Sequence, residues 1–388
     1  SDGIIEAVES TEFKPILGVQ YHPETFFRHG EMTSMHALFE WLVHEGALYH
    51  RSRKLHESTV TLDSHCDTPM FFPDSQDDVN HMFTTRTDRV LVDLPKMTDG
   101  RLDASIMVAY IPQGERSAQG YREAFALAQK KLDQIEALTR AHPHVLGLAS
   151  SPDDLLRFKA QGIKAIMRGI ENGYAIGRDL SLLSHFRQMG VVYMTLCHNG
   201  DNDICDSARG HAEHGGLSAF GQEVVREMNA LGMMIDMSHA AESSFYDALA
   251  LSQAPIVCSH SSSRALCSHP RNLTDDQMKA LAAQGGVAQV TLYHGFLRHE
   301  GEATVLDALD HLHHMVQVMG PEHVGIGTDF DGDGGVRGLK DASELIGFTR
   351  QLLRRRYSES DLQGIWGGNF LRVMRQVQSS ATTHLGLS

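Results

Sequence analysis

The sequence lacks the features that mark membrane, disulfide-rich and nucleic-acid-binding proteins. No apolar run approaches the roughly 18 residues that a membrane helix needs, and residues 1–10 are too acidic and polar for a signal peptide. The five cysteines are scattered without a CxxC pair, which indicates neither a disulfide framework nor a thiolate zinc site. The formal net charge of −15 opposes binding to nucleic acid or to an anionic membrane. We therefore expect a cytoplasmic protein, with export open if the N-terminus is trimmed.

Phosphate-binding glycine motifs are also absent, because no GxGxxG and no P-loop opens any expected helix. Core-forming residues are plentiful, since 41% of the 388 residues are hydrophobic and 21% are charged. A chain of this length has room for one large barrel plus a small extra segment, or for two domains.

Residues 216–272 show the pattern around which the chain is organised. Apolar residues recur at helical spacing from Phe220 to Leu231, and the strand-like run MMIDMSH then ends at His239. A second helix over residues 241–253 leads to the run APIVCSH, which ends at His260. Two parallel strands that finish in this way place both imidazoles on one rim. In α/β barrels the C-terminal rim holds the active site.

The same alternation of helix and strand runs through most of the chain and predicts nine strands. Four others end on metal-binding residue types: STVTLDSHCD at His65 and Asp67, IKAIMRGIE at Glu171, VVYMTLCH at His198, and VGIGTDF at Asp329. A (β/α)8 barrel of the TIM type best explains this α/β pattern, with one strand peripheral or misread. A doubly wound sheet is the runner-up. We expect residues 71–98 to form a long irregular loop over the rim.

Seven residues at strand ends form the candidate site: His65, Asp67, Glu171, His198, His239, His260 and Asp329. Imidazole and carboxylate ligands without a thiolate suit Zn²⁺ or Mn²⁺ in an open catalytic site. Five such ligands suit two ions, with one carboxylate bridging them. Most of the 24 histidines have no such placement, and we expect His311, His313 and His314 to be solvated or packed on one helix.

Residues 1–49 do not continue this pattern. Two strands are expected in SDGIIEAVES and PILGVQYHPE, then an amphipathic helix over residues 32–48 and a polar, basic connector over residues 50–58. DGIIEAVE followed by GVQYHPE resembles the C-terminal piece of class I glutamine amidotransferases and gamma-glutamyl hydrolases. The resemblance implies that His22 and Glu24 belong to a triad whose cysteine nucleophile would lie far upstream. We expect a truncated piece of a doubly wound domain (1–49) before a barrel domain (50–388), with the missing part of the first domain as a partner.

From about Ser58 to Gln378 the motifs resemble the renal (membrane) dipeptidase family of zinc peptidases. SHCDTP is similar to that family's GHNDLP, GIENG to GIEGG, YMTLCHN to YLTLTH, HPRN to RRN and GTDFDG to GGDFDG, while IDMSH and VCSHSS supply two further histidines. The resemblance implies two zinc ions per chain. By it, the first zinc is held by His65 and Asp67, the second by His239 and His260, and both by Glu171.

The same resemblance implies the roles of the remaining residues. His198 would contact the scissile carbonyl oxygen, and Arg271 would bind the terminal carboxylate of the substrate through its bidentate fork. Asp329, rather than Asp331, would handle protons and the substrate amine. Tyr293 would line the pocket. A metal-bridging hydroxide would then hydrolyse the peptide bond of a dipeptide, and a D-residue at its second position would be tolerated.

The chain departs from the family pattern in ways that bear on pocket shape. Cys66 and Thr68 replace an asparagine and a leucine, and the histidine that often follows GIEGG is missing. We also expect a homodimer. Two alternatives stay open: another amidohydrolase that acts on N-acyl amino acids, lactams or phosphoesters, and a non-catalytic partner that completes a glutaminase through His22 and Glu24.

Overall fold

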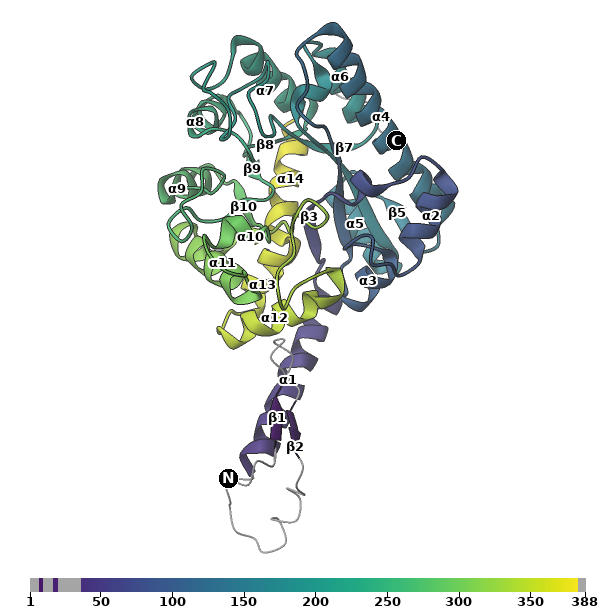
Figure 1. Ribbon diagram of the computed structural model, residues 1–388, viewed down its shortest axis with the longest axis vertical. Helices are drawn as coiled ribbons and strands as arrows, with labels where there is room; N and C mark the ends of the chain where they lie inside the picture. Colours follow the sequence, from purple (N-terminus) through teal and green to yellow (C-terminus); the bar gives the residue numbers. More distant parts are fainter. Residues whose placement is uncertain (1–6, 10–16, 20–35, 383–388) are drawn as a thin grey trace, which may run out of the picture.

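The computed structural model is a nearly closed barrel of parallel strands surrounded by helices (Figure 1). It describes residues 7–9, 17–19 and 36–382, so His22 and Glu24 lie outside the described residues. Eight strands follow one another around the barrel: β3 (Leu62–Cys66), β4 (Ala104–Tyr110), β6 (Lys164–Glu171), β7 (Val191–Thr195), β8 (Met234–Asp236), β9 (Val257–Cys258), β10 (Val287–Val290) and β11 (Val324–Ile326). The predicted α/β barrel is confirmed.

The ninth predicted strand is the peripheral one. β5 (Leu146–Leu148) pairs only with the first residues of β6, at Lys164 to Ile166, while β7 pairs with β6 further along, from Arg168 to Glu171. β5 therefore pairs with the part of the β6 edge that β7 leaves open, and it is not one of the eight barrel strands.

The barrel closes where its last strand meets its first. Cys66 forms a parallel bridge with Phe330. The amide of Asp67 donates to the carbonyl of Phe330 at 2.8 Å, and the amide of Asp329 donates to the carbonyl of His65 at 3.1 Å. Because these bonds join the two chain ends of the barrel at its C-terminal rim, they fix the residues of two distant sequence motifs side by side.

The opposite end of the barrel is plugged by the last helix. One apolar cluster gathers residues from the first halves of the strands, such as Leu62, Ala104 and Val257, with Phe370 and Met374 of α14 (Asn369–Ser379). A larger cluster lies between the strands and the outer helices. With one end filled by apolar side chains, only the C-terminal rim is open for a polar site.

The outer layer consists of the helices between the strands and two that follow the last strand: α2 (Gln76–Thr84), α3 (Leu94–Asp99), α4 (Ala118–Ala141), α5 (Pro152–Ala160), α6 (Ser181–Gln188), α7 (Ala219–Leu231), α8 (Glu242–Leu251), α9 (Asp275–Ala283), α10 (His294–Leu297), α11 (Val305–Met319), and then α12 (Leu345–Arg354) and α13 (Glu359–Gln363). Single turns of tighter helix lie at η2 (Thr68–Phe71), η3 (Gly173–Ile176), η4 (Pro321–His323) and η5 (Ala342–Glu344), and a π-turn at η6 (Gly364–Gly368).

The expectation of a long irregular loop over residues 71–98 is wrong, because α2 and α3 lie within it. Each helix begins at a capping residue: the side chain of Ser75 accepts from the amide of Asp78, and that of Asp93 accepts from the amide of Lys96. These short capped helices are too brief to show an apolar period, which is why the sequence pattern missed them.

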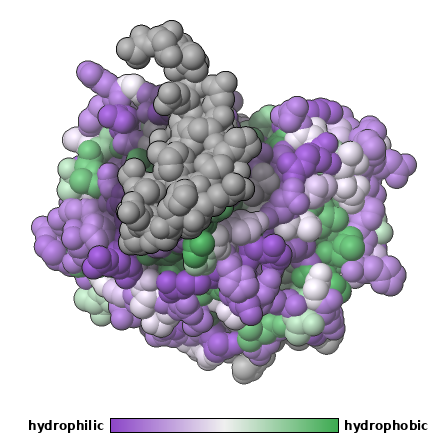
Figure 2. Space-filling model, turned by 90° about the horizontal axis from the view of Figure 1, so that it is seen from below, coloured by the Kyte–Doolittle hydropathy of each residue, from purple (hydrophilic) through white to green (hydrophobic). Residues whose placement is uncertain are grey.

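The N-terminal segment is described only in part. β1 (Ala7–Glu9) and β2 (Leu17–Val19) pair antiparallel, as two of the predicted strands. α1 (His36–Ser58) projects from the barrel, and it continues through residues 50–58, where a connector was expected. That expectation is wrong because Ser52, Leu55 and His56 of the last turns are buried against the barrel. The end of the molecule from which α1 projects is mainly hydrophilic (Figure 2). No helix among the described residues is long and apolar enough to cross a membrane.

His56 anchors α1 through a fully satisfied buried chain of hydrogen bonds. Trp366 Nε1 donates to Thr349 Oγ1 at 2.8 Å, and Thr349 Oγ1 lies 2.6 Å from His56 Nε2, which accepts its proton. His56 Nδ1 then donates to the carbonyl of Arg101 at 3.3 Å. Burial lowers the pKa of His56 from 6.5 to about 4. A second ring proton would leave two donors facing each other, so the folded protein holds this ring neutral.

This network predicts acid sensitivity that resides in one residue. The unfolded chain takes up a proton on His56 near pH 6.5, and the folded chain only near pH 4, so acid favours unfolding in that window. Between pH 7 and pH 5 the native protein should lose about 2 kcal/mol more unfolding free energy than His56→Gln, as measured by urea denaturation. His44→Gln, at an exposed site on the same helix, should behave as native. An identical pH dependence in all three proteins would contradict this account.

Candidate metal centre

The structure brings all seven candidate residues together at the C-terminal rim. Each lies at the end of its strand or within three residues after it: His65 and Asp67 on β3, Glu171 on β6, His198 after β7, His239 after β8, His260 after β9 and Asp329 after β11. All except the half-buried His198 are buried. The rule that parallel strands of a barrel end on one rim (the strand-end rule) therefore located the cluster from the sequence alone.

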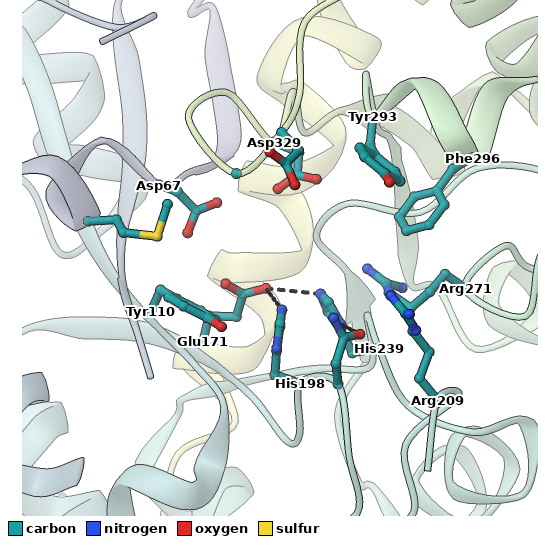
Figure 3. A pocket seen from close by; sticks show the side chains of 14 residues that line it. Asp67, Tyr110, Glu171, His198, Arg209, His239, Arg271, Tyr293, Phe296 and Asp329 are labelled. Atoms are coloured by element: carbon teal, nitrogen blue, oxygen red, sulfur yellow. Dashed lines mark hydrogen bonds and ion pairs between the residues drawn. The ribbon is translucent and has the colours of Figure 1, made fainter. Parts of the chain in front are cut away.

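Glu171 is the hub of this cluster. Its Oε1 lies 3.0 Å from His239 Nε2 and 3.5 Å from His260 Nε2. The same oxygen lies 3.7 Å from His65 Nε2 and 4.0 Å from His198 Nε2. Four imidazole nitrogens from four strands thus converge on one carboxylate, and Figure 3 shows two of these pairs as dashed lines.

Three sets of ligand atoms lie close enough to hold a metal ion, each within 4.8 Å of one another. They are His65, Asp67 and Glu171; Glu171, His239 and His260; and His65, His260 and Asp329. The first two sets share only Glu171. Because its carboxylate has two oxygens, it can serve both sets at once, which is the arrangement of a bridged two-metal site.

Hydrogen bonds fix the ring of His65 with Nε2 toward the cavity. Its Nδ1 lies 2.8 Å from the hydroxyl of Tyr193. That hydroxyl donates its own proton to the carbonyl of Ser64 at 2.9 Å, so it must accept from His65. The proton of a neutral ring is therefore on Nδ1, and the Nε2 lone pair is available to a metal.

The other two histidines are held in the same way. His260 Nδ1 lies 2.8 Å from Ser259 Oγ, which itself donates to Asp236 Oδ2 at 2.6 Å. His239 Nδ1 donates to Asn199 Oδ1 at 3.3 Å. Both rings then direct an Nε2 lone pair at the cavity, and these two nitrogens lie only 2.9 Å apart. Two facing lone pairs repel each other unless a cation lies between them.

Two further buried atoms call for a cation. His65 Nε2 and Asp67 Oδ1 are buried without a hydrogen-bond partner among the described residues. An unsatisfied buried polar atom is costly. Donor atoms that are all imidazole nitrogen or carboxylate oxygen suit Zn²⁺ or a similar divalent ion. The residues present therefore fit a resident metal.

The three buried acids of the cavity cannot all ionise easily. Burial opposes ionisation of Glu171, but the imidazoles of His65 and His198 outweigh it and hold its pKa well below the ordinary value. Burial raises the pKa of Asp67, and the charge of Glu171 raises it further. Burial also raises the pKa of Asp329 well above its ordinary value, with Asp67 adding to the effect. Divalent cations would remove this conflict by compensating the carboxylates.

The pKa values of the buried imidazoles also shift in opposite directions. Burial lowers the pKa of His239 and of His260 well below the ordinary value, which keeps both rings in the neutral form that metals bind. Burial also opposes the charged form of His65, but Tyr193 and Glu171 outweigh it and raise the pKa of His65. Where no metal is bound, a proton on His65 compensates the carboxylates instead.

A pocket of about 310 Å³ opens over the cluster. Asp67 and Asp329 lie on one side of it and Arg271 on the other, with Glu171 and His198 between them (Figure 3). This volume is at the small end for ligand sites.

Arg271 is a buried cation with spare hydrogen-bonding capacity. Its guanidinium carbon lies 5.1 Å from the centre of the Phe296 ring, and its Nη2 donates a long bond of 3.5 Å to the carbonyl of His260. Its Nε has no partner among the described residues. A buried guanidinium in this state is suited to bind a carboxylate from a ligand.

Comparison with known proteins places this geometry in a family. The family model for membrane dipeptidase (Peptidase family M19) matches residues 49–385. The chain belongs to this family. Dipeptidase 3 of Mus musculus is 36% identical over 337 residues, and the match spans 84% of this chain and 66% of the mouse protein, slightly less than two thirds of its length. Dipeptidase verJ of Clonostachys rogersoniana is 33% identical over 344 residues, covering 84% of this chain and 87% of that protein.

Solved structures agree with this membership of the membrane dipeptidase family. The probable dipeptidase PvdM from Pseudomonas aeruginosa superposes with a TM-score of 0.81 at 28% identity, covering 86% of this chain and 99% of that one. A second family model, Peptidase C26, matches residues 1–24, where the sequence resembled an amidotransferase end.

The structure also shows which of the two aspartates after β11, Asp329 or Asp331, faces the pocket. Asp329 lines the pocket. Asp331 instead accepts from Thr68 Oγ1 at 2.5 Å and from the amide of Leu91 at 2.7 Å, so both of its oxygens are already hydrogen-bonded within the protein. Tyr293 lines the pocket, as expected. His311 is packed, with Nδ1 accepting from the amide of Ser263 at 3.0 Å.

Sequence reasoning missed seven further lining residues: Met70, Tyr110, Asn199, Arg209, Phe296, Gly332 and Asp333. Tyr110 is the last residue of β4, so the strand-end rule could have found it. Phe296 lies on the four-residue helix α10, and Arg209 lies in a long loop after β7. Neither of these two positions carries a periodic signal.

The shared carboxylate predicts how metal content depends on Glu171. Glu171→Gln removes the anionic ligand common to two metal sets, so the purified protein should lose most of its bound metal rather than one ion. Elemental analysis after dialysis against zinc measures this. His314→Gln is the control, because His314 pairs with Asp275 between outer helices at 2.8 Å, and its metal content should equal that of the native protein. Full metal occupancy in Glu171→Gln would refute the bridging role.

Proposed function

We propose that the protein is a zinc-dependent dipeptidase whose substrate is bound in the pocket between Arg271 and Asp329. The observation that carries this proposal is the convergence of four imidazole Nε2 atoms on the Glu171 carboxylate, within 4.0 Å, beside a buried arginine whose Nε has no hydrogen-bond partner in the described part of the chain. Membership of the membrane dipeptidase family supports the same reaction.

The metal ligands would be five residues. His65 and Asp67 would hold one zinc ion, His239 and His260 the other, and Glu171 both. Zinc bound there would supply Lewis acidity, which lowers the pKa of a water molecule and polarises a carbonyl group. The Nδ1 bonds described above support this assignment, because they orient each imidazole before any metal arrives.

His198 would stabilise the negative charge that develops on the carbonyl oxygen. It lines the pocket, its Nε2 faces the same cavity as Glu171, and its ring packs edge-on against Tyr110 at 4.8 Å. Burial lowers the pKa of His198, so its ring is neutral near pH 7. A neutral ring with its proton on Nε2 donates a hydrogen bond to the oxygen as charge accumulates there.

Asp329 would carry the proton to the departing amine. Its carboxylate faces the cavity, with Oδ1 4.0 Å from His65 Nε2, on the side away from Arg271. A dipeptide held by its carboxylate at Arg271 extends toward Asp329, so the nitrogen of its scissile bond, one residue from that carboxylate, lies between the two side chains. Asp329 opens the tight DFDGDGG turn with a backbone φ of 61°, a strained conformation of the kind that occurs at functional sites.

Asp329→Asn should keep the fold and lose turnover. The amide has the same shape but cannot accept and pass on a proton, so kcat should fall by a factor on the order of 10²–10⁴. Steady-state amino-acid release gives kcat, and elemental analysis shows whether metal stays bound. Native kcat in a metal-loaded variant would exclude the proton role.

Arg271 should set the length limit of the substrate. Arg271→Met removes the partner of the terminal carboxylate, and kcat/KM for dipeptides should fall about 100-fold, mainly through KM. Dipeptide amides, which have no such carboxylate, should be poor substrates of the native enzyme and should lose much less in the variant. Equal losses for acids and amides would show that Arg271 does not read the carboxylate.

The proposal as a whole is tested by amino-acid release from matched L,L- and L,D-dipeptides, before and after chelation and zinc add-back. Hydrolysis that chelation abolishes and zinc restores is the expected result, with the D-residue tolerated at the second position. A zinc-loaded protein that cleaves N-acyl amino acids or lactams but no dipeptide would replace this proposal, since Arg271 fits any substrate with a carboxylate there.

A further inference from the structure

A second arginine lines the pocket beside Arg271. Arg209 lies in the loop between β7 and α7, and its side chain faces the same side of the cavity (Figure 3). Unlike Arg271, it is exposed. Its guanidinium makes no hydrogen bond or ion pair with any residue in the described ranges. The pocket therefore has one cation in its wall and another at its mouth.

The backbone that carries Arg209 is fixed to the metal centre. The amide of Ala208 donates to the carbonyl of His239 at 2.8 Å. Ser207 Oγ donates to the carbonyl of His198 at 2.5 Å and accepts from the amide of Arg209 at 3.2 Å. The backbone of Arg209 thus has a defined position relative to the reacting centre, which limits where its side chain can reach.

Asp201 holds the loop on both sides of Arg209. Its carboxylate accepts from the amide of Ser207 and from that of His211, each at 2.7 Å. A Cβ at Gly210 would lie 1.7 Å from Asp201 Oδ1, so this carboxylate and the glycine next to Arg209 fit only together. The loop is a built structure at this point.

The opposite side of the pocket is acidic. Asp67 and Asp329 lie there, and Gly332 packs so closely against them that an added Cβ would lie 2.2 Å and 2.6 Å from their oxygens. Asp333, which follows Gly332, also lines the pocket. With zinc bound, Asp67 is compensated as a ligand, but Asp329 and Asp333 are not among the five proposed zinc ligands, so an anionic side chain is favoured on the arginine side.

We propose that Arg209 selects dipeptides whose C-terminal residue has an acidic side chain, aspartate or glutamate. Arg271, inside the wall, binds the main-chain carboxylate, and Arg209, nearer the mouth, binds the carboxylate of the side chain that extends toward solvent. This inference rests on the proposed dipeptidase function and names its substrate class. An acidic N-terminal residue is disfavoured, because its side chain meets the acidic side.

The test compares kcat/KM for Ala–Glu and Ala–Gln of the same configuration, because the two differ only in the charge of the side chain. The native zinc enzyme should prefer Ala–Glu by about tenfold, the effect of a charge-assisted hydrogen bond at a partly exposed site. Arg209→Met should bring this ratio close to one, and Arg209→Lys should retain part of it. The native ratio should also fall as ionic strength rises, which a purely structural role would not produce.

Arg116→Met is the matched control. Arg116 pairs with Glu213 of the same loop but does not line the pocket, so its removal should leave the ratio unchanged. Glu–Ala should be a poorer substrate than Gln–Ala. An equal preference for Ala–Glu and Ala–Gln in the native enzyme, or equal losses on both in Arg209→Met, would overturn the inference while dipeptidase function stands. A zinc-loaded native enzyme that cleaves no dipeptide would remove both.

Discussion

The attraction between one buried carboxylate and the surrounding imidazoles is what the rest of this site depends on. Glu171 is almost entirely buried, and burial of an isolated carboxylate is strongly unfavourable. Here four imidazole nitrogens lie within 4.0 Å of the same oxygen, and the buried acids and lone pairs around it need positive charge between them. A cluster that is costly without cations and compensated with them is an effective metal site. Its stability and its metal content are then linked.

The barrel supplies the precision that such a site needs. Glu171 ends β6, His65 lies in β3, and His239 and His260 follow β8 and β9, so hydrogen bonding within one sheet sets their spacing. A deeper layer of polar groups, including Tyr193, Ser259 and Asp236, orients the rings from below. Loops then add the residues that contact the variable parts of a substrate. Arg271 and Arg209 both come from loops, but Arg271 donates to the carbonyl of His260, and Ala208, next to Arg209, donates to the carbonyl of His239.

The sequence could predict the frame and the charged centre because both follow simple rules. Parallel strands place their C-terminal ends on one rim. His239 and His260, at the ends of two such strands, could therefore be predicted to lie close together, and the same rule placed His65, Glu171 and Asp329 beside them. It could not place Arg209, since no periodicity governs a loop whose course is set by the carboxylate of Asp201. The helices in residues 71–98 and the continuation of α1 to Ser58 were missed because capping and tertiary burial, rather than an apolar period, form them. The expected homodimer and the role of residues 1–49 stay predictions.

The most direct test of the central claim is the anomalous scattering of a zinc-loaded crystal, recorded on both sides of the zinc absorption edge. The account predicts two peaks, one on either side of the Glu171 carboxylate and roughly 3.5–4 Å apart, the first against His65 and Asp67 and the second against His239 and His260. A single peak that Glu171 does not contact, or no peak at the rim of the barrel, would contradict the claim that this carboxylate joins two metal sites.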